Sequence, residues 1–335
     1  MTTLLKAAGN LLVILTALVL TASLCPRMVE AQERLRIAWA GGASNAAIWI
    51  VQDKALLKKH GVNAEFISVN ASTIALQAML AGELDAIVTS VTTLVSSRLA
   101  GADVKIILAM VPTFPAHIVA PKNLTDIKQL KGRTGGVGRP GTTTEIGMRM
   151  GLSRLGIDPN LDVKLVPVGA TADALAALAK GVVQFGVLVE PFVREAEKLG
   201  FKSLVDIGAL NLPFHWNGVL TREATIRAKA PLLARLGRAL VEAIHSFKHD
   251  KASTLRTISK YTRITDTESL ERTYNGFIKI LPETPLPSAD GVKSYLDFLA
   301  PTRPEAAKAN ANEFVDLSFV QEIQASGFIK QLYGR

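Results

Sequence analysis

The sequence predicts an α/β protein of two similar lobes, each a mostly parallel sheet flanked by helices. After the first thirty residues, short apolar strands alternate with helical stretches, which is the pattern of a parallel sheet covered by helices. A second observation is a pattern of small and apolar residues that recurs 99 residues later. The matched residues are Ala75, Leu76, Ala78 and Gly82 in the first copy and Ala174, Leu175, Ala177 and Gly181 in the second. Each copy opens with a strand, a glycine turn and a helix.

The first copy accounts for three strands and three helices. We expect strands at residues 35–39, 64–69 and 86–89, and helices at residues 46–59, 74–81 and 94–100. Duplication of one unit and the common sequence pattern of α/β proteins both explain the repeat. Both explanations predict the same two lobes.

The N-terminal segment has the pattern of a secretory signal peptide. Lys6 precedes an apolar run at residues 11–23, and Val29-Glu30-Ala31 suits a signal peptidase, so we expect cleavage after Ala31. A membrane anchor is the alternative, but the run is shorter than the about 20 residues that span a bilayer. Cys25 lies where a lipoprotein cysteine would lie, and the large Leu24 before it disfavours lipidation.

Composition narrows the possible partners. The chain carries a net charge of +9, and loss of Lys6, Arg27 and Glu30 with the signal peptide leaves +8. Because no basic tract or aromatic-interleaved stripe is present, we expect no nucleic-acid partner. The charge instead favours small anions or an anionic membrane surface. Cys25 is the single cysteine, so the mature chain would have no disulfide or thiolate chemistry.

The stretch GVGRPGTTTEIG, residues 136–147, looks like a nucleotide-binding loop. Gly136, Gly138 and Gly141 fit the dinucleotide fingerprint. The second strand of that motif should end in an acid that holds the ribose, but residues 164–168 are followed by Gly169-Ala170. A phosphate-binding P-loop fails as well, because Thr142 stands where the lysine should be.

The same stretch also has the features of an anion-binding site. A glycine turn followed by Thr142, Thr143 and Thr144 leaves backbone N–H groups and hydroxyls at a helix start. The alternative is an ordinary threonine N-cap that Glu145 completes as a capping box. Residues 41–45 form an equivalent turn in the first lobe, and two such helix starts could face one cleft.

The chain resembles the type II periplasmic binding proteins of ABC importers, in the branch that binds nitrate, sulfonates, taurine and thiamine precursors. The resemblance rests on the order and spacing of short motifs over nearly the whole mature chain. These are Arg36-Ile37-Ala38 with Gly41-Gly42, residues 48–57 with Gly61-Val62, residues 78–86, residues 138–144, Glu190-Pro191-Phe192 and residues 315–320.

The resemblance implies that the chain crosses twice between its lobes. Strand-like crossings lie at residues 116–120 and 216–220. The expected organisation is a signal peptide at residues 1–31, lobe one at residues 32–117 and 217–335, and lobe two at residues 118–216. The C-terminal part of lobe one would begin with an amphipathic helix, apolar at Leu232, Leu233, Leu236, Leu240, Ala243, Ile244 and Phe247.

No catalytic or metal-binding motif is evident. The sequence lacks both G-x-S-x-G and H-E-x-x-H. His245 and His249 have the spacing of a metal pair on a helix, but no third ligand is apparent, so we interpret them as solvated. We therefore expect no enzyme activity, no cofactor and no bound metal.

The candidate ligand-binding residues come from the glycine turns, the strand ends and the crossings. They are Trp39, Asn45, Thr89, Ser90, His117, Thr142, Thr143, Glu190 and Trp216. A buried structural role is the alternative for His117. Glu190 is either a helix N-terminal acid or a cleft carboxylate, and in the cleft it would repel an anion and prefer a ring N–H.

Two ligand classes follow from these residues. The threonines and helix starts favour a sulfonate or similar oxyanion, whereas Glu190 and Trp216 suit a planar nitrogen heterocycle such as a thiamine-precursor pyrimidine. The resemblance implies a monomeric periplasmic protein that delivers its ligand to an ABC transporter permease in the inner membrane. An exported enzyme on the same scaffold and a receptor-coupled sensing subunit are the other functions considered.

The first prediction concerns the N-terminus. Mass spectrometry of protein recovered from a bacterial periplasm should show a chain that starts near Gln32 and carries no lipid. An acylated Cys25 would contradict it and indicate a tethered protein.

Overall fold

The computed structural model describes residues 34–334. The predicted signal peptide, its cleavage site and Cys25 lie outside the described residues.

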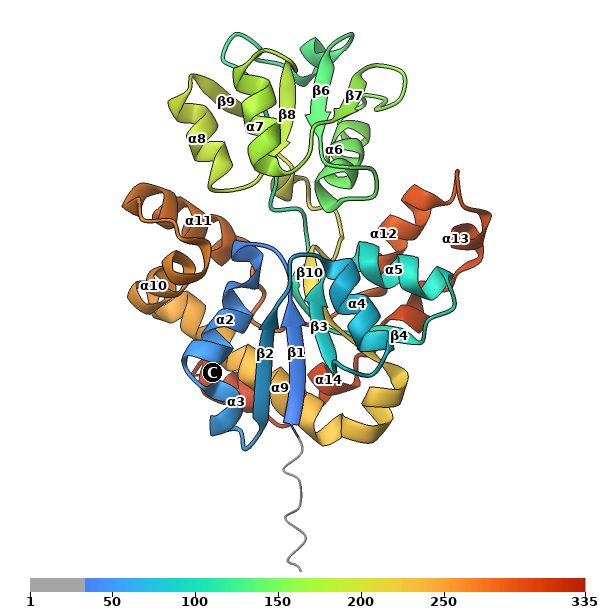
Figure 1. The fold of residues 1–335 in the computed structure, drawn as a ribbon, viewed down its shortest axis with the longest axis vertical. Coiled ribbons are helices and arrows are strands. Elements are labelled where there is room, and N and C mark those ends of the chain that lie inside the picture. The colour runs from blue at the N-terminus through green and yellow to red at the C-terminus, as the bar shows by residue number, and fades with distance from the viewer. Residues whose placement is uncertain (1–33, 335) are drawn as a thin grey trace, which may run out of the picture. The chain divides into compact units, whose positions relative to one another are not determined.

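The first sheet has five strands in the order β2-β1-β3-β10-β4 (Figure 1). β1 and β3 pair in parallel, whereas β10 runs antiparallel to both β3 and β4. The strands are β1 (Arg34–Trp39), β2 (Asn63–Ser68), β3 (Ala86–Thr89), β4 (Val104–Val111) and β10 (Asn217–Arg222).

The second sheet repeats this arrangement in the order β7-β6-β8-β5-β9. β6 is parallel to β7 and β8, and β5 runs antiparallel to β8 and β9. Its strands are β5 (His117–Pro121), β6 (Thr134–Val137), β7 (Lys164–Pro167), β8 (Phe185–Leu188) and β9 (Phe201–Asp206). The predicted two-lobed α/β fold is therefore confirmed.

The chain crosses between the sheets twice, after β4 and after β9. The strands expected at residues 116–120 and 216–220 correspond to β5 and β10, and each enters its new sheet in the antiparallel direction. The lobe boundaries that we drew from the sequence stay predictions.

The structure bears out the 99-residue repeat. α4 (Ser72–Leu80) and α7 (Thr171–Ala179) begin and end 99 residues apart, and so do β3 and β8. α5 (Val91–Leu99) and α8 (Phe192–Lys198) are nearly equivalent. The two lobes thus place the same kinds of helix starts at the same positions of their sheets.

The helix expected at residues 46–59 is broken in the structure. α2 (Ala46–Asp53) and α3 (Leu56–Lys59) are separated by Ala55, whose φ of 50° is left-handed. A left-handed residue cannot continue an α-helix. The break turns Leu56 and Leu57 into the core, where both are buried.

Helices cover both faces of the first sheet. Alternate residues of β3 point to opposite faces: Val88 packs in one core cluster with α2 and α9, and Ile87 in another with α4 and α5. α9 (Glu223–His249) contains Pro231, is interrupted at Lys229, and buries the apolar face expected from the sequence.

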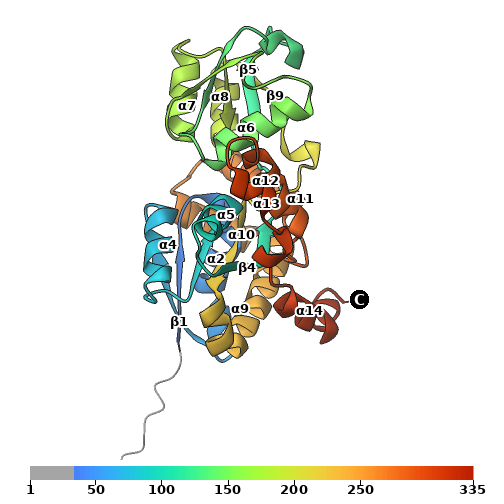
Figure 2. The ribbon, with the colours of Figure 1, turned by 90° about the vertical axis from the view of Figure 1, so that its right-hand side faces the viewer.

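Further helices complete the two lobes. The second sheet is accompanied by η2 (Ile127–Leu130), α6 (Thr143–Arg154), α7, α8 and η3 (Gly208–Leu210), whereas η1 (Ala43–Asn45) follows β1. The C-terminal part contains α10 (Lys251–Thr262), α11 (Thr267–Ile280), α12 (Ala289–Leu299), α13 (Pro304–Lys308), η4 (Ala311–Phe314), α14 (Ser318–Ala325) and α15 (Phe328–Leu332). α12 lies against α5 (Figure 2).

His215 connects the second crossing to the start of α12. Its side chain is fully buried, and Nε2 lies 2.9 Å from the carbonyl oxygen of Ser288. Ser288 in turn caps α12 by accepting a hydrogen bond from the Gly291 amide. Burial lowers the pKa of His215 below its ordinary 6.5, although the Ser288 carbonyl opposes this. The lowered pKa favours a neutral imidazole, whose Nε2 atom faces both the carbonyl oxygen and, at 3.2 Å, the amide of Ser288.

The second prediction follows from this lowered pKa. An unfolded histidine takes up a proton more readily than folded His215, so the stabilisation is complete above pH 6.5 and declines as the pH falls toward the folded pKa. Urea unfolding between pH 7.5 and 5 should show a decreasing free energy of unfolding. His215→Asn should flatten this dependence, and His249→Asn, at the exposed end of α9, is the control. An equally steep profile in both variants would contradict the assignment.

Candidate ligand-binding cleft

A cavity of about 800 Å³ lies at the ends of strands from both sheets. We call it the main cavity. Its walls come from the segments that follow β1, β2 and β3 in the first lobe and β6, β7 and β8 in the second. The lining includes residues 40–44, 70–73, 89–90, 142–143, 170–172 and 189–190, together with Pro115, Arg139, Phe192, Trp216, Asn217 and Phe277.

Four helices begin at the main cavity, and in none does the side chain of the N-cap residue form a capping hydrogen bond, although the Asp173 carboxylate accepts one from the Ala170 amide at the start of α7. α4, α5, α6 and α7 have the N-cap residues Ala71, Ser90, Thr142 and Ala170, and none of these makes a side-chain capping hydrogen bond. By contrast, Asp250, Asp266 and Ser288 cap α10, α11 and α12 away from this cavity. Uncapped first-turn N–H groups and the positive end of the helix dipole suit an anion.

The α6 turn does not form the capping box that was the alternative interpretation of its sequence. The hydroxyl of Thr142 donates to the Arg139 carbonyl at 2.7 Å. The carboxylate of Glu145 instead pairs with Arg149 and accepts a long 3.4 Å hydrogen bond from the Gly141 amide. The first N–H groups of α6 therefore stay available to a ligand.

Gly138 is required for this local geometry. A Cβ atom at Gly138 would lie 2.3 Å from the Thr142 hydroxyl oxygen and 2.5 Å from that of Thr144. Gly141 has a φ of 81°, which L-residues rarely adopt. The glycines that imitate a nucleotide motif thus bring threonine hydroxyls close to the backbone.

Two charged residues among those described line the main cavity, Arg139 and Glu190. Glu190 receives a hydrogen bond from Arg272 Nε at 3.1 Å, which compensates its charge. Arg139 is exposed, and within residues 34–334 its guanidinium forms no ion pair. The cavity wall is therefore electropositive. Sequence analysis missed Arg139 because a single arginine in a turn forms no pattern.

Six of the nine candidate residues line the main cavity. They are Thr89, Ser90, Thr142, Thr143, Glu190 and Trp216. His117 instead lines an adjoining cavity of about 570 Å³, together with Glu190 and Arg272. The Nδ1 atom of His117 lies 2.9 Å from the Ser203 hydroxyl, so part of its hydrogen-bonding capacity is used within the second sheet.

Asn45 and Trp39 do not line either cavity. Asn45 is fully buried; its amide donates to the carbonyls of Ala40 and Gly42 and accepts from Asn217. It therefore fixes the first glycine turn from behind. Trp39 packs edge-on against Trp49 and Tyr261.

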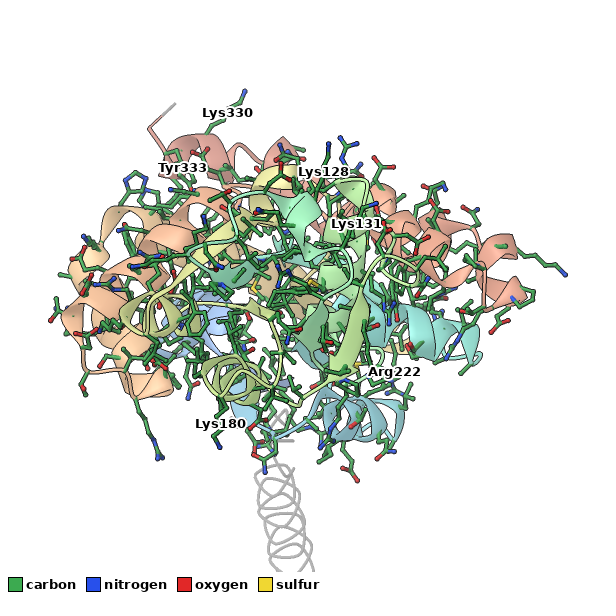
Figure 3. The ribbon with its side chains drawn as sticks, turned by 90° about the horizontal axis from the view of Figure 1, so that it is seen from above. Lys128, Lys131, Lys180, Arg222, Lys330 and Tyr333 are labelled. Atoms are coloured by element: carbon green, nitrogen blue, oxygen red, sulfur yellow. The ribbon has the colours of Figure 1, made fainter. Side chains whose placement is uncertain are left out.

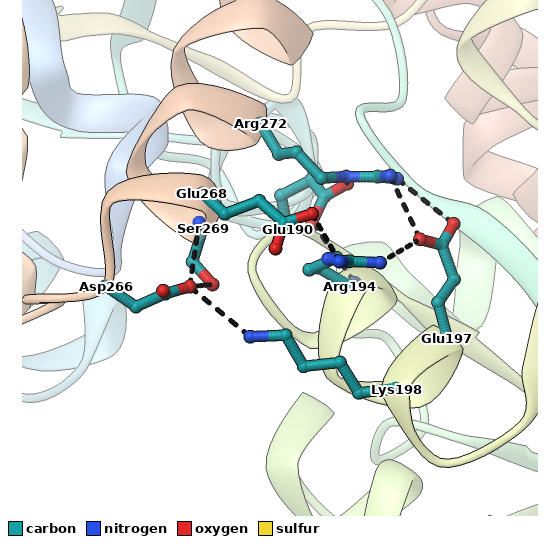
Figure 4. Close-up of polar contacts among 8 residues, drawn as sticks. All are labelled: Glu190, Arg194, Glu197, Lys198, Asp266, Glu268, Ser269 and Arg272. Atoms are coloured by element: carbon teal, nitrogen blue, oxygen red, sulfur yellow. Dashed lines mark hydrogen bonds and ion pairs between the residues drawn. The ribbon is translucent and has the colours of Figure 1, made fainter.

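A group of ion pairs joins α8 of the second lobe to α11 of the first (Figure 4). Arg272 binds both oxygens of Glu197, at 2.9 and 3.1 Å, in addition to Glu190. Arg194 pairs with Glu268. We call these residues the interlobe bridge.

The interlobe bridge also includes Lys198, which lies 3.4 Å from Asp266. The hydroxyl and amide of Ser269 hold the pKa of Asp266 at about 2. This carboxylate stays charged at any ordinary pH, so its contribution to the bridge does not titrate near neutrality.

Other surface features suggest no further chemistry. His245 and His249 lie with ring centroids 4.3 Å apart, but no cluster of three metal-ligating side chains occurs within the described part of the chain. Between residues 34 and 334, no helix has the length and apolar character needed to cross a membrane. The labelled Lys128, Lys180 and Lys330 belong to separate segments (Figure 3).

Comparison with known proteins identifies the class and then the family. The fold is that of periplasmic binding proteins. It is similar to the periplasmic aliphatic sulphonate binding protein SsuA from Escherichia coli (TM-score 0.72, 18% identity, 85% of this chain and 92% of that chain). It is also similar to the periplasmic nitrate-binding protein NrtA from Synechocystis PCC 6803 (TM-score 0.69, 13% identity, 87% and 88%).

A third similar structure is the alkanesulfonate-binding protein SsuA from Xanthomonas axonopodis pv. citri bound to MOPS (TM-score 0.69, 18% identity, 84% and 98%). The model of the NMT1-like family matches residues 29–261, and the chain belongs to this family. No curated protein sequence matches this chain. The sequence-based assignment to this branch of binding proteins is confirmed.

The third prediction concerns the interlobe bridge. Arg272→Glu should place three carboxylates together and separate α8 from α11, and adding Glu197→Arg should restore the contact. The distance between spin labels on the two lobes should broaden toward longer values in the single variant and return in the double variant. Because these side chains are partly exposed, we expect a loss of only about 1 kcal/mol in the free energy of unfolding. Glu195→Arg, on the exposed face of α8, is the control; unchanged distances in Arg272→Glu would refute the bridge.

Proposed function

We propose that the protein captures a small organic oxyanion in the main cavity and delivers it to an ABC transporter permease. The observation that carries this proposal is the convergence of α4, α5, α6 and α7 on one cavity. The N-cap residues of these helices form no capping hydrogen bond with their own side chains, and Arg139 stands at the same wall with no ion pair among the described residues. Such a wall offers N–H donors, hydroxyls and one guanidinium, which are the groups that bind sulfonates and carboxylates.

The names of the similar structures agree with this ligand class. The proteins from Escherichia coli and Xanthomonas are named for sulfonates and the Synechocystis protein for nitrate, and all of these are oxyanions. Because the identities are below 25%, these structures support the fold alone, and the proposed ligand class rests on the cavity of this chain.

Binding is non-covalent in this proposal. The two crossings that precede β5 and β10 act as hinges, so the lobes can approach each other around the ligand. Closure removes water from the N–H donors and strengthens their interaction with the anion. The closed monomer then presents surfaces of both lobes to the permease in the inner membrane. We propose that the protein works in the periplasm after removal of its signal peptide.

A nitrogen heterocycle such as a thiamine-precursor pyrimidine is the second candidate ligand. Trp216 favours it, because its side chain lines the main cavity and could stack on a planar ring. Glu190 disfavours it, because Arg272 already occupies the carboxylate that would accept a ring N–H. The oxyanion therefore remains the preferred class.

The fourth prediction tests the ligand class. A thermal-shift screen should find hits among sulfonates and carboxylates rather than pyrimidines, and a ligand at 100 times its Kd should stabilise the protein by about 2.7 kcal/mol. Arg139→Ala should weaken binding of the best hit roughly tenfold or more, because charge-assisted hydrogen bonds contribute about 1.5–3 kcal/mol. Thr142→Ala should weaken it as well, because it removes the hydroxyl that holds the Arg139 carbonyl in the turn. Glu190→Gln should change the affinity little.

Matched controls are Arg154→Ala, at the other end of α6, and Thr265→Ala, on the exposed surface before α11. Pyrimidine hits that depend on Glu190 and not on Thr142 would reject the oxyanion. Conversion of any bound compound by the purified protein would contradict non-enzymatic capture, and normal uptake of that compound in a strain that lacks this protein would favour a sensing role.

A further inference from the structure

The main cavity adjoins a second cavity of about 700 Å³, which we call the side cavity. The two share Ser72, Thr73, Ser90, Thr142 and Thr143 at the starts of α4, α5 and α6. A group bound at these helix starts is therefore in direct reach of both. An inorganic anion would occupy only the shared wall and leave the side cavity to solvent.

The outer wall of the side cavity is aromatic and apolar. Tyr295 and Phe298 of α12 lie with nearly parallel rings, 6.1 Å between centroids and 17° between planes. Leu299 continues this wall, and Leu76 of α4 also lines the cavity. Tyr295 is buried, at 3% exposure, and α12 packs against α5 through its buried face. The rings are thus held on a rigid element rather than on a loop.

The polar groups of the side cavity also suit an anionic compound. Glu145 lines it, but its carboxylate is engaged by Arg149. Arg303 lines it from just beyond α12, is exposed, and forms no ion pair among residues 34–334. The hydroxyls of Thr92, Thr93 and Ser96 supply both donors and acceptors. The uncompensated charge of this wall is positive, as it is in the main cavity.

We propose that the ligand is an aromatic oxyanion, with its acidic group at the shared helix starts and its ring in the side cavity against Phe298, the partly exposed member of the aromatic pair, which the buried Tyr295 supports from behind. This inference rests on the proposed function and specifies its substrate class. Sites for small organic molecules combine apolar and aromatic walls with a few fixed polar groups, and aromatic pairs gain from ring geometry beyond the area that they bury. The side cavity meets both conditions, whereas an inorganic anion or methanesulfonate would use neither ring.

The fifth prediction compares three sulfonates by isothermal titration calorimetry. Benzenesulfonate should bind the full mature chain roughly tenfold more tightly than propane-1-sulfonate, and methanesulfonate should bind most weakly. Phe298→Ala should remove most of the preference for benzenesulfonate while leaving the Kd of methanesulfonate within about twofold of the wild-type value. Phe298→Leu, which keeps an apolar side chain, should retain the binding of propane-1-sulfonate and lose the preference for the ring.

Phe328→Ala, on α15 outside both cavities, is the matched control and should change none of the three affinities. Equal binding of methanesulfonate and benzenesulfonate would overturn the aromatic assignment and leave the oxyanion proposal intact. A Phe298→Ala variant that weakens all three sulfonates equally would also overturn it. Absence of binding by sulfonates and carboxylates of every kind would refute the proposed function and this inference together.

Discussion

The main cavity exists because helices that follow parallel strands begin at the carboxyl edge of their sheet. In this chain two such edges contribute to one cavity, since the strand-to-helix segments after β1, β2, β3, β6, β7 and β8 all line it. The antiparallel entry of β5 and β10 lets the chain change sheets without disturbing the parallel strands that carry the helices. Helix starts and their flanking turns, together with residues such as Arg139, Glu190 and Trp216, then line the cavity.

In the proposed function, charge compensation sets the preference of this wall for an anion. A bare Glu190 beside the helix starts would repel an anion, but Arg272 reaches it from α11 and also holds Glu197. The same contact that joins the lobes therefore neutralises the acidic side chain of the main cavity. Arg139 and Arg303 remain as cations without ion pairs in the described chain, one in each cavity. The lobe contact and the proposed anion preference would thus share one physical origin.

The sequence predicted the fold because the fold follows from local patterns. The repeat that links α4 to α7 depends on apolar spacing and glycine turns, and both are visible without a structure. The Thr142 turn was recognisable for the same reason. Asn45 shows the limit of prediction from sequence. Its place in the first glycine turn suggests a ligand contact, whereas its side-chain amide donates hydrogen bonds to the backbone carbonyls of that turn.

The remaining site residues could not be predicted because they depend on distant contacts. Arg272 meets Glu190 across 82 residues of chain, and Tyr295 reaches the cavity only through the packing of α12 on α5. Arg303 and Arg139 are single basic residues in connecting segments. Nothing in such a segment's composition distinguishes a cavity arginine from a solvated one.

A crystal structure with the tightest-binding oxyanion from the screen tests the central claim most directly. We predict acidic oxygens within about 3.2 Å of first-turn backbone N–H groups of α6 and of at least one of α4 and α5, with the guanidinium of Arg139 nearby. An acidic group bound away from these helix starts, or held only by side chains in the cavity beside His117, would contradict the account.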